Sequence, residues 1–114
     1  MTGLASQRCV PCRGGEPPLP DHKIQELREE LPGWQVVEAD GVKQLQRQFD
    51  FPDFQSALRF TNRVGEIAEE VDHHPELVTA WGQVEVRWWT HVIRGLHKND
   101  FIMAARTDRL HEGQ

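Results

Sequence analysis

The sequence predicts an α+β domain in which helices cover one face of a four-stranded antiparallel sheet, in the order α-β-β-α-β-β-α. Two pairs of β-type segments are each joined by a short turn containing glycine, which indicates two hairpins. A strongly amphipathic stretch lies between the pairs, and a helical pattern lies on each side of the set. The 114 residues suffice for one hydrophobic core, so we expect no second globular domain.

The elements follow from the spacing of the apolar residues and from the turn residues between them. Asp21 offers an N-cap for the first helix, and Asp40-Gly41 supplies the positive φ angles of a tight hairpin turn. Pro75 bounds the long central helix, and His91 closes the fourth strand. We expect helices over 21–31, over 54–71 and around residue 100, with strands over 34–38, 42–49, 77–81 and 83–91.

Residues 1–20 are predicted to be a flexible N-terminal leader before the folded domain of residues 21–114. The leader is rich in proline and glycine and has few apolar residues, a composition typical of segments that extend and turn but do not pack. It also contains the two cysteines, Cys9 and Cys12. A Cys-x2-Cys pair is half of a zinc site or a redox pair, and no second pair completes a site, so we expect reduced thiols and no metal.

Charge and hydropathy exclude several classes of function. Eighteen acidic against thirteen basic side chains give a formal net charge of −5, which repels the phosphate backbone of nucleic acids. No apolar run approaches the ~18 residues needed to cross a bilayer, and the start of the chain lacks the pattern of a signal peptide. We therefore expect a cytoplasmic protein with neither nucleic-acid nor membrane partners.

Three of the six histidines lie on segments that this fold brings together. His73 and His74 sit between the long helix and the third strand, and the antiparallel hairpin returns His91 to their neighbourhood. Adjacent side chains in an extended segment point apart, so His73 and His74 should face different surroundings. Imidazoles suit proton transfer near pH 7, which makes this group the main candidate for chemistry.

Plainer interpretations of the same residues remain open. A His-His-Pro sequence is often a helix-ending turn with solvated imidazoles, and adjacent histidines seldom bind one metal together. Asp100 is most simply a carboxylate in the first turn of a helix, with a role in a site as the alternative. Trp81, beside a turn glycine, is the tryptophan that we expect near a ligand.

The string Glu69-x3-His73-His74-Pro75-x5-Trp81-x9-His91-x8-Asp100 holds seven residues at fixed spacings. It resembles the signature of the pterin-4a-carbinolamine dehydratases, and the flanking strings LPGW (31–34), RVGEIAEEVDHHPEL (63–77) and THVIRGLHKNDFIMAA (90–105) are similar to that family as well. The resemblance covers roughly residues 21–110. The leader resembles that of some bacterial relatives, and no role is carried over to it.

The resemblance implies an enzyme that dehydrates 4a-hydroxytetrahydropterins to quinonoid dihydropterins in tetrahydrobiopterin recycling, without a metal or an organic cofactor. His73 and His91 match the acid/base pair of the family, and His74 matches a histidine that holds the substrate. We hypothesise that Glu69 orients His73, because it precedes that residue by one helical turn. The substrate pocket is expected to include Glu69, His74, Pro75, Trp81 and Asp100.

The resemblance also implies a homodimer or homotetramer and a functional link to an aromatic amino acid hydroxylase, which makes the substrate. Leu77 stands where animal relatives often have tryptophan, so the preferred pterin side chain stays open. Two alternatives remain. One is a protein-interaction module with a relic site, since animal relatives also serve as dimerisation partners of a homeodomain transcription factor. The other is an enzyme for a pterin of the molybdopterin route.

Overall fold

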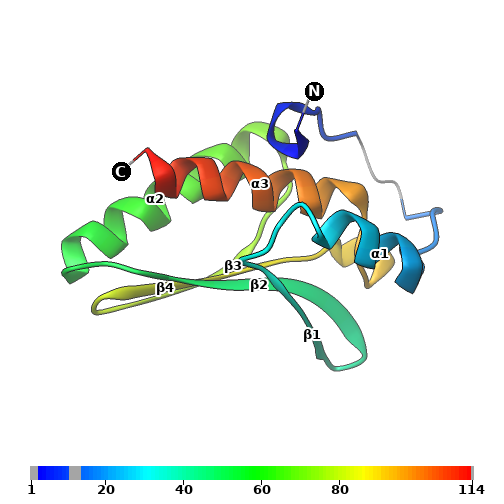
Figure 1. Cartoon of the computed structure of the whole chain (residues 1–114), viewed down its shortest axis with the longest axis horizontal. Coiled ribbons are helices and arrows are strands. Elements are labelled where there is room, and N and C mark those ends of the chain that lie inside the picture. The colour runs from blue at the N-terminus through cyan, green and yellow to red at the C-terminus, as the bar shows by residue number, and fades with distance from the viewer. Residues whose placement is uncertain (1–2, 11–13, 114) are drawn as a thin grey trace.

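The computed structural model describes residues 3–10 and 14–113 and confirms the predicted α+β architecture (Figure 1). One antiparallel sheet has the strand order β1-β2-β4-β3, and α1, α2 and α3 lie on one of its faces. Two short 3-10 helices, η1 and η2, add to the predicted order. The bounds are η1 Leu4–Ser6, α1 Asp21–Arg28, β1 Gln35–Ala39, β2 Val42–Asp50, α2 Phe54–Val71, β3 Glu76–Ala80, β4 Gln83–Trp88, η2 His91–Ile93 and α3 Lys98–Glu112.

Both predicted hairpins form, and together they place β4 inside the sheet. Asp40 and Gly41 have φ angles of 51° and 76°, the left-handed values that the turn between β1 and β2 requires. Gly82, with φ 78°, serves the turn between β3 and β4. β2 pairs with β4 from Leu45 opposite Trp88 onward, so β4 has a neighbour on each side. The strand that leads toward His91 is therefore held on both edges.

The start of α1 differs from the prediction. Pro20 occupies the N-cap position and Asp21 is the first helical residue, so the expectation that Asp21 caps the helix is wrong. Pro20 has φ −73° and ψ 160°, a conformation that its ring favours and that a cap residue needs. The carboxylate of Asp21 instead accepts a hydrogen bond from Lys43 of β2. α1 also ends at Arg28, and Leu31 closes a following turn by donating to the carbonyl of Arg28 over 2.8 Å.

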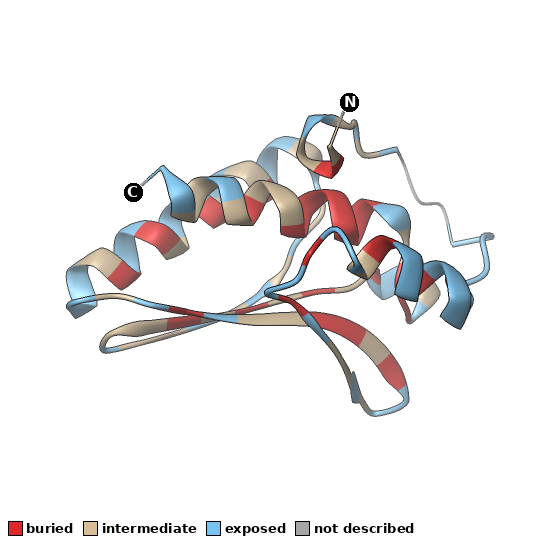
Figure 2. Cartoon of the chain, in the orientation of Figure 1, coloured by how far each residue is buried: buried red, intermediate tan, exposed pale blue. Residues whose placement is uncertain are grey.

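The core lies between the inner face of the sheet and the helices (Figure 2). The alternation in β4 places Val84, Val86 and Trp88 inward with no exposed surface. Each large apolar side chain buried in this way contributes about 1.5–3 kcal/mol of stabilisation. α2 and α3 supply the opposite wall of the core, with Ala57, Phe60, Val64 and Ala68 from α2 and Phe101, Ile102, Met103 and Ala104 from α3.

The outer face of the sheet is polar. Arg87 of β4 donates from Nε to Glu85 over 2.8 Å and from Nη1 to Gln44 of β2 over 3.1 Å. Gln46 donates to the second oxygen of Glu85 over 3.4 Å. An antiparallel sheet with such a face can meet water directly. Along the described residues, no helix combines the length and apolar character that crossing a bilayer requires.

The N-terminal residues pack more closely than their composition predicts. Leu4 is 3% exposed and belongs to the main core, and Cys9 and Leu19 pack against that core. Arg106 of α3 donates to the backbone carbonyls of Ala5 and Gln7 over 3.3 and 2.6 Å. One buried leucine and a few backbone contacts thus attach residues 3–10 to α3, although this segment is poor in apolar residues. The domain boundary at residue 21 stays a prediction.

Candidate active site

The end of α2 presents His73 through a Schellman motif. Asp72 follows the helix in the left-handed conformation, with φ 53° and ψ 44°. Its N–H donates to the carbonyl of Glu69 over 3.3 Å, and the N–H of His73 donates to the carbonyl of Ala68 over 3.2 Å. These two bonds satisfy carbonyls at the helix end and reverse the chain. The motif fixes the backbone of His73 before β3 begins.

The side chain of His73 points inward and is held on two sides. Its Nε2 lies 2.6 Å from Oδ1 of Asp100, and its ring stacks on Trp88 with centroids 5.7 Å apart. Because a carboxylate accepts, Nε2 carries the proton in this bond, and Nδ1 of the neutral ring has the free lone pair. Its side chain is 13% exposed. The structure therefore excludes, for His73, the interpretation as a solvated residue in a helix-ending turn.

Asp100 joins the start of α3 to this histidine. Its second carboxylate oxygen accepts from the hydroxyl of Thr90 over 2.8 Å and from the N–H of His97 over 2.9 Å. The bond to His97 belongs to a capping box at the N-terminus of α3. Asp100 has no exposed surface. Asp100 therefore both caps the first turn of α3 and contacts His73.

His91 approaches the same region from a short loop. β4 ends at Trp88, and Thr90 pairs with Gly95 in an isolated bridge that encloses η2. The prediction that His91 closes the fourth strand is therefore wrong, because the bridge folds residues 90–95 out of the sheet. The ring of His91 stacks on Trp89, with centroids 4.5 Å apart and planes 24° apart. This stacking orients an otherwise exposed imidazole.

His74 points away from His73, as predicted, and pairs with Glu69. Its Nε2 lies against the Glu69 carboxylate, and both side chains are exposed. The hypothesis that Glu69 orients His73 is therefore wrong. The Schellman turn directs His73 toward Asp100, and it is His74 that lies beside Glu69. Pro75 then keeps His74 out of the helical region, and β3 starts directly afterwards.

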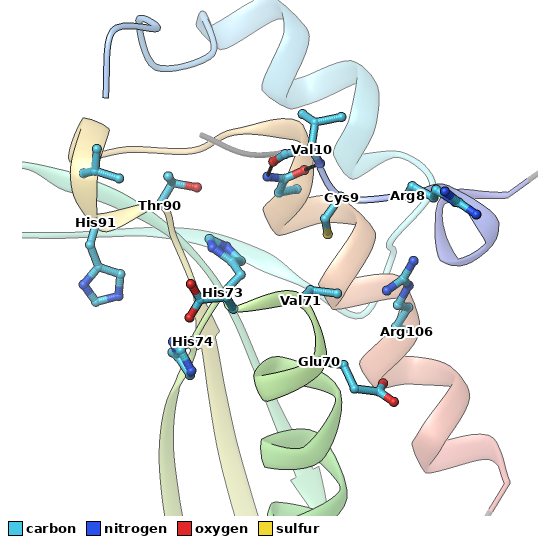
Figure 3. Close-up of a pocket in the computed structure, with 13 residues that line it drawn as sticks. Arg8, Cys9, Val10, Glu70, Val71, His73, His74, Thr90, His91 and Arg106 are labelled. Atoms are coloured by element: carbon cyan, nitrogen blue, oxygen red, sulfur yellow. Dashed lines mark hydrogen bonds between the residues drawn. The ribbon is translucent and has the colours of Figure 1, made fainter. Parts of the chain in front are cut away.

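The three histidines line one cavity of about 770 Å³, a size typical of small-molecule sites. Figure 3 shows the imidazoles on one side, Arg8 and Arg106 on the other, and Cys9 and Val10 between them. The cavity brings together the end of α2, the η2 loop, α3 and the N-terminal segment. Its lining consists of Arg8, Cys9, Val10, Glu70, Val71, Asp72, His73, His74, Thr90, His91, Val92, Asn99 and Arg106.

The other residues predicted for the pocket fall into two groups. Glu69 and Asp100 bind the lining histidines without lining the cavity, and Pro75 shapes the adjoining turn. Trp81 lies at the β3–β4 turn, at the far end of β3 from His74, and is 73% exposed. Within one chain it is not among the residues that line this cavity.

Sequence reasoning missed the contribution of the N-terminal segment and of α3. Arg8, Cys9 and Val10 lie in the predicted leader, and Asn99 and Arg106 stand on α3 without any motif to mark them. Leu4, which is buried in the structure, attaches this segment to the domain, but no motif in the sequence marks it. The bonds between Val10 and Asn99 join residues 89 positions apart, and contacts at such a distance produce no periodic pattern in the sequence.

Cys9 is a free thiol at the edge of this cavity, and Cys12 lies outside the described residues. Burial raises the pKa of the Cys9 thiol above its ordinary value, the positive charge of Arg106 opposes this, and the negative charge of Asp100 adds to it. Within residues 3–10 and 14–113, no three histidine, cysteine or acidic side chains are grouped so that they could hold a metal ion.

Known proteins with similar sequences carry one family name. Residues 17–110 match the family model described as pterin 4 alpha carbinolamine dehydratase. A protein of Chlorobium limicola, whose name gives it as a candidate pterin-4-alpha-carbinolamine dehydratase, is 58% identical over 113 residues, which are 99% of this chain and 100% of the relative. A protein of Saccharophagus degradans with the same name is 54% identical over the same shares of both chains.

Two solved structures share the fold. A Brucella melitensis protein described as a transcriptional coactivator/pterin dehydratase superimposes with a TM-score of 0.75 at 34% identity, over 82% of this chain and 97% of that one. A pterin dehydratase-like RuBisCO assembly factor of the alpha-carboxysome matches with a TM-score of 0.58 at 19% identity, over 68% of this chain and 88% of that one, which shows the fold alone. The lining residues 8–10 precede the range that the family model covers. From the family model and the full-length relatives, the chain belongs to the pterin 4 alpha carbinolamine dehydratase family.

Proposed function

We propose that this chain dehydrates 4a-hydroxytetrahydropterins to quinonoid dihydropterins by histidine acid/base catalysis. One observation carries the proposal: three imidazoles from two separate segments line a single cavity, and a buried carboxylate fixes one of them. Family membership and the names of the relatives supply the substrate class. The arrangement suits a reaction that needs protons moved near neutral pH.

The chemistry requires one proton to be delivered and one to be removed. The bond between carbon 4a and its hydroxyl oxygen breaks, and the hydroxyl takes up a proton and leaves as water. The N–H of ring nitrogen 5 loses its proton, and the electron pair left behind forms the double bond to carbon 4a. No electron or hydride is exchanged with another molecule, so the proposal assigns no metal and no organic cofactor.

We assign the two proton transfers to His73 and His91 and the holding of the substrate to His74. Nδ1 of His73 has a free lone pair when Nε2 donates to Asp100, so His73 can accept a proton without losing that bond. His91 lines the same cavity from the η2 loop, is exposed and can exchange protons with water. A positioned acid or base typically contributes ~10² to 10⁴-fold each.

The test is the rate of dehydration of a 4a-hydroxytetrahydropterin generated by an aromatic amino acid hydroxylase and followed by ultraviolet absorbance. His91→Ala should lower turnover at least about 100-fold and leave the far-ultraviolet circular dichroism unchanged. His22→Ala is the matched control, since His22 is an exposed histidine on α1 outside the cavity. A His91→Ala enzyme within a few-fold of the wild type would refute the acid/base assignment.

We further propose that the enzyme works in the cytoplasm, in tetrahydrobiopterin recycling beside an aromatic amino acid hydroxylase, as a homodimer or homotetramer. Exposed Phe54, Leu58 and Trp81, on α2 and on the nearby β3–β4 turn, support the association of copies. Trp81→Lys should shift the mass measured by light scattering toward the monomer. An unchanged mass would remove this surface from the proposal.

A second candidate function is a protein-interaction module with a relic site. The description of the Brucella melitensis protein as a transcriptional coactivator as well as a pterin dehydratase favours it. The same absorbance assay discriminates the two, because a relic site would leave the spontaneous rate of dehydration unchanged. Binding measurements with several pterins address a molybdopterin-related substrate, since an enzyme adapted to that substrate should bind the simple carbinolamine poorly.

A further inference from the structure

We propose that the N-terminal segment Arg8–Val10 is a wall of the substrate cavity and that Asn99 is the positioning residue that holds it there. The proposal rests on the proposed function and adds a binding element from outside the residues that carry the histidine chemistry. The wall would contact one face of the bicyclic ring system, while the histidines meet the 4a-hydroxyl and ring nitrogen 5. Three sets of contacts support it.

The first set joins the backbone of Val10 to the side chain of Asn99. The N–H of Val10 donates to Oδ1 of Asn99 over 2.9 Å, and Nδ2 of Asn99 donates to the carbonyl of Val10 over 2.6 Å. Asn99 is 4% exposed, and its own N–H donates to Nδ1 of His97 over 3.0 Å. An amide side chain is suited to such a pair because it offers a donor and an acceptor side by side.

The same helical turn therefore holds two parts of the site. Asn99 fixes the N-terminal segment, and the next residue, Asp100, fixes His73. A change in the position of this turn moves the wall and the histidine together. The wall is thus set relative to the reacting groups by one rigid element, the start of α3.

The second set holds the rest of the segment. Arg106, two turns further along α3, donates to the carbonyls of Ala5 and Gln7. Leu4 is buried in the core, so the segment is anchored on both sides of Arg8. Residues 4–10 consequently form a fixed part of the described fold.

The third set joins residues 14–19, which follow the wall in the chain, to the loop that carries His91. A Cβ atom at Gly14 would lie 2.6 Å from Cγ2 of Val92, so this glycine packs directly on that side chain. The N–H of Leu19 donates to the carbonyl of Leu96 over 2.9 Å. Residues 14–19 thereby contact the loop that carries His91 and Val92.

The side chains of the wall indicate what it contacts. Val10 and Val92 both line the cavity, and they are 55% and 54% exposed despite being apolar. Half-exposed valines beside imidazoles offer apolar contact to the face of a ring whose polar atoms lie at its edge. The face of a 4a-hydroxytetrahydropterin that does not carry the hydroxyl meets this description, so binding it would remove both valines from water.

Two variants test the wall by separating substrate affinity from turnover. Asn99→Ala removes both bonds to Val10 and should raise KM about tenfold, which corresponds to ~1.4 kcal/mol, with kcat changed less than about threefold. Val10→Trp fills the cavity from an exposed position and should raise KM by at least as much with an unchanged melting temperature. Lys98→Ala, at the neighbouring exposed position on α3, and Gln48→Trp, on the outer sheet face, are the controls and should behave as the wild type.

Unchanged KM values in both variants would overturn the proposal, and so would a fall in kcat at unchanged KM, since Asn99 would then act through His73. If Asn99→Ala does not fold, Val10→Trp alone decides by the same criteria. Failure of the proposed function has a different signature, because the wild type would then not accelerate dehydration at all. In that case the dissociation constant of 7,8-dihydrobiopterin, measured by calorimetry, becomes the readout, and equal affinity in wild type and Val10→Trp would overturn the wall.

Discussion

The imidazole of His73 and the carboxylate of Asp100 form a contact of 2.6 Å in which the carboxylate has no exposed surface. The two residues are 27 positions apart and come from the end of α2 and the first turn of α3. Three donors converge on this one carboxylate: the ring of His73, the hydroxyl of Thr90 and the N–H of His97. The site histidine and the helix N-terminus are therefore stabilised by the same group.

Replacing Asp100 by asparagine should impair both stability and turnover. Asparagine has one acceptor oxygen where aspartate has two, so at least one of the converging donors loses its acceptor. We expect a loss of about 1–3 kcal/mol in the free energy of unfolding and a fall in kcat of about tenfold or more. Urea denaturation and the absorbance assay measure the two effects.

Asp108→Asn is the matched control, because Asp108 is a partly buried aspartate on the same helix and does not line the cavity. It should leave kcat within about threefold of the wild type. Full activity of Asp100→Asn would show that His73 needs no anionic partner.

Glu69→Gln should have a much smaller effect than Asp100→Asn. The side chains of Glu69 and His74 are 78% and 52% exposed, and water screens an exposed pair so that it contributes about 0.2–1 kcal/mol. We expect kcat within about threefold of the wild type and little change in the melting temperature. A tenfold or larger fall in kcat would instead make this carboxylate part of the acid/base machinery.

The sequence was sufficient for the elements whose pattern is local. The Asp40-Gly41 turn, the alternation along β4 and the apolar stripe of α2 each depend on residues within a few positions, and all three appear in the structure. The convergence of His73, His74 and His91 followed from the topology, since a strand that returns antiparallel brings the ends of its hairpin together.

The partners of those histidines were not predictable in the same way. Helical spacing places Glu69 near His73, but the left-handed conformation of Asp72 turns His73 inward and leaves His74 to the glutamate. Periodicity does not reveal such a turn at a residue other than glycine. Val10 and Asn99 are 89 positions apart, and the Asn99 side chain bonds only backbone atoms of Val10. No sequence pattern therefore indicated that the N-terminal segment lines the cavity.

The thiol of Cys9 should react slowly in the folded protein. Burial raises its pKa above the ordinary value of 9.0, and the thiolate, which is the reactive form, is therefore scarce at neutral pH. In a Cys12→Ser variant, iodoacetamide should modify native protein more slowly than urea-denatured protein at pH 8, with the native rate still rising above pH 9. Mass spectrometry at timed intervals measures the rate. Equal rates in the two states would contradict the protection that partial burial gives the thiol.

Asp108 offers a test of how burial and charge compete on α3. Its carboxylate accepts from Nε1 of Trp34 and from Nη1 of Arg47, each over 2.8 Å. Burial nevertheless raises the pKa of Asp108 above 3.8, because desolvation of the carboxylate outweighs the Trp34 hydrogen bond and the Arg47 charge. The folded state therefore holds this proton more tightly than the unfolded chain does.

The sign of the pH dependence follows from that difference. Between the unfolded pKa near 3.8 and the higher folded value, the folded state binds more protons, so this group's contribution to stability falls as pH rises through that window. Asp108→Asn removes the titration, so the free energy of unfolding of wild type minus variant should decrease with pH from about 4 upward and then level off. Urea denaturation of both proteins at several pH values measures the difference. A difference that increases with pH would mean that the attraction of Arg47 dominates and that the pKa of Asp108 is lowered.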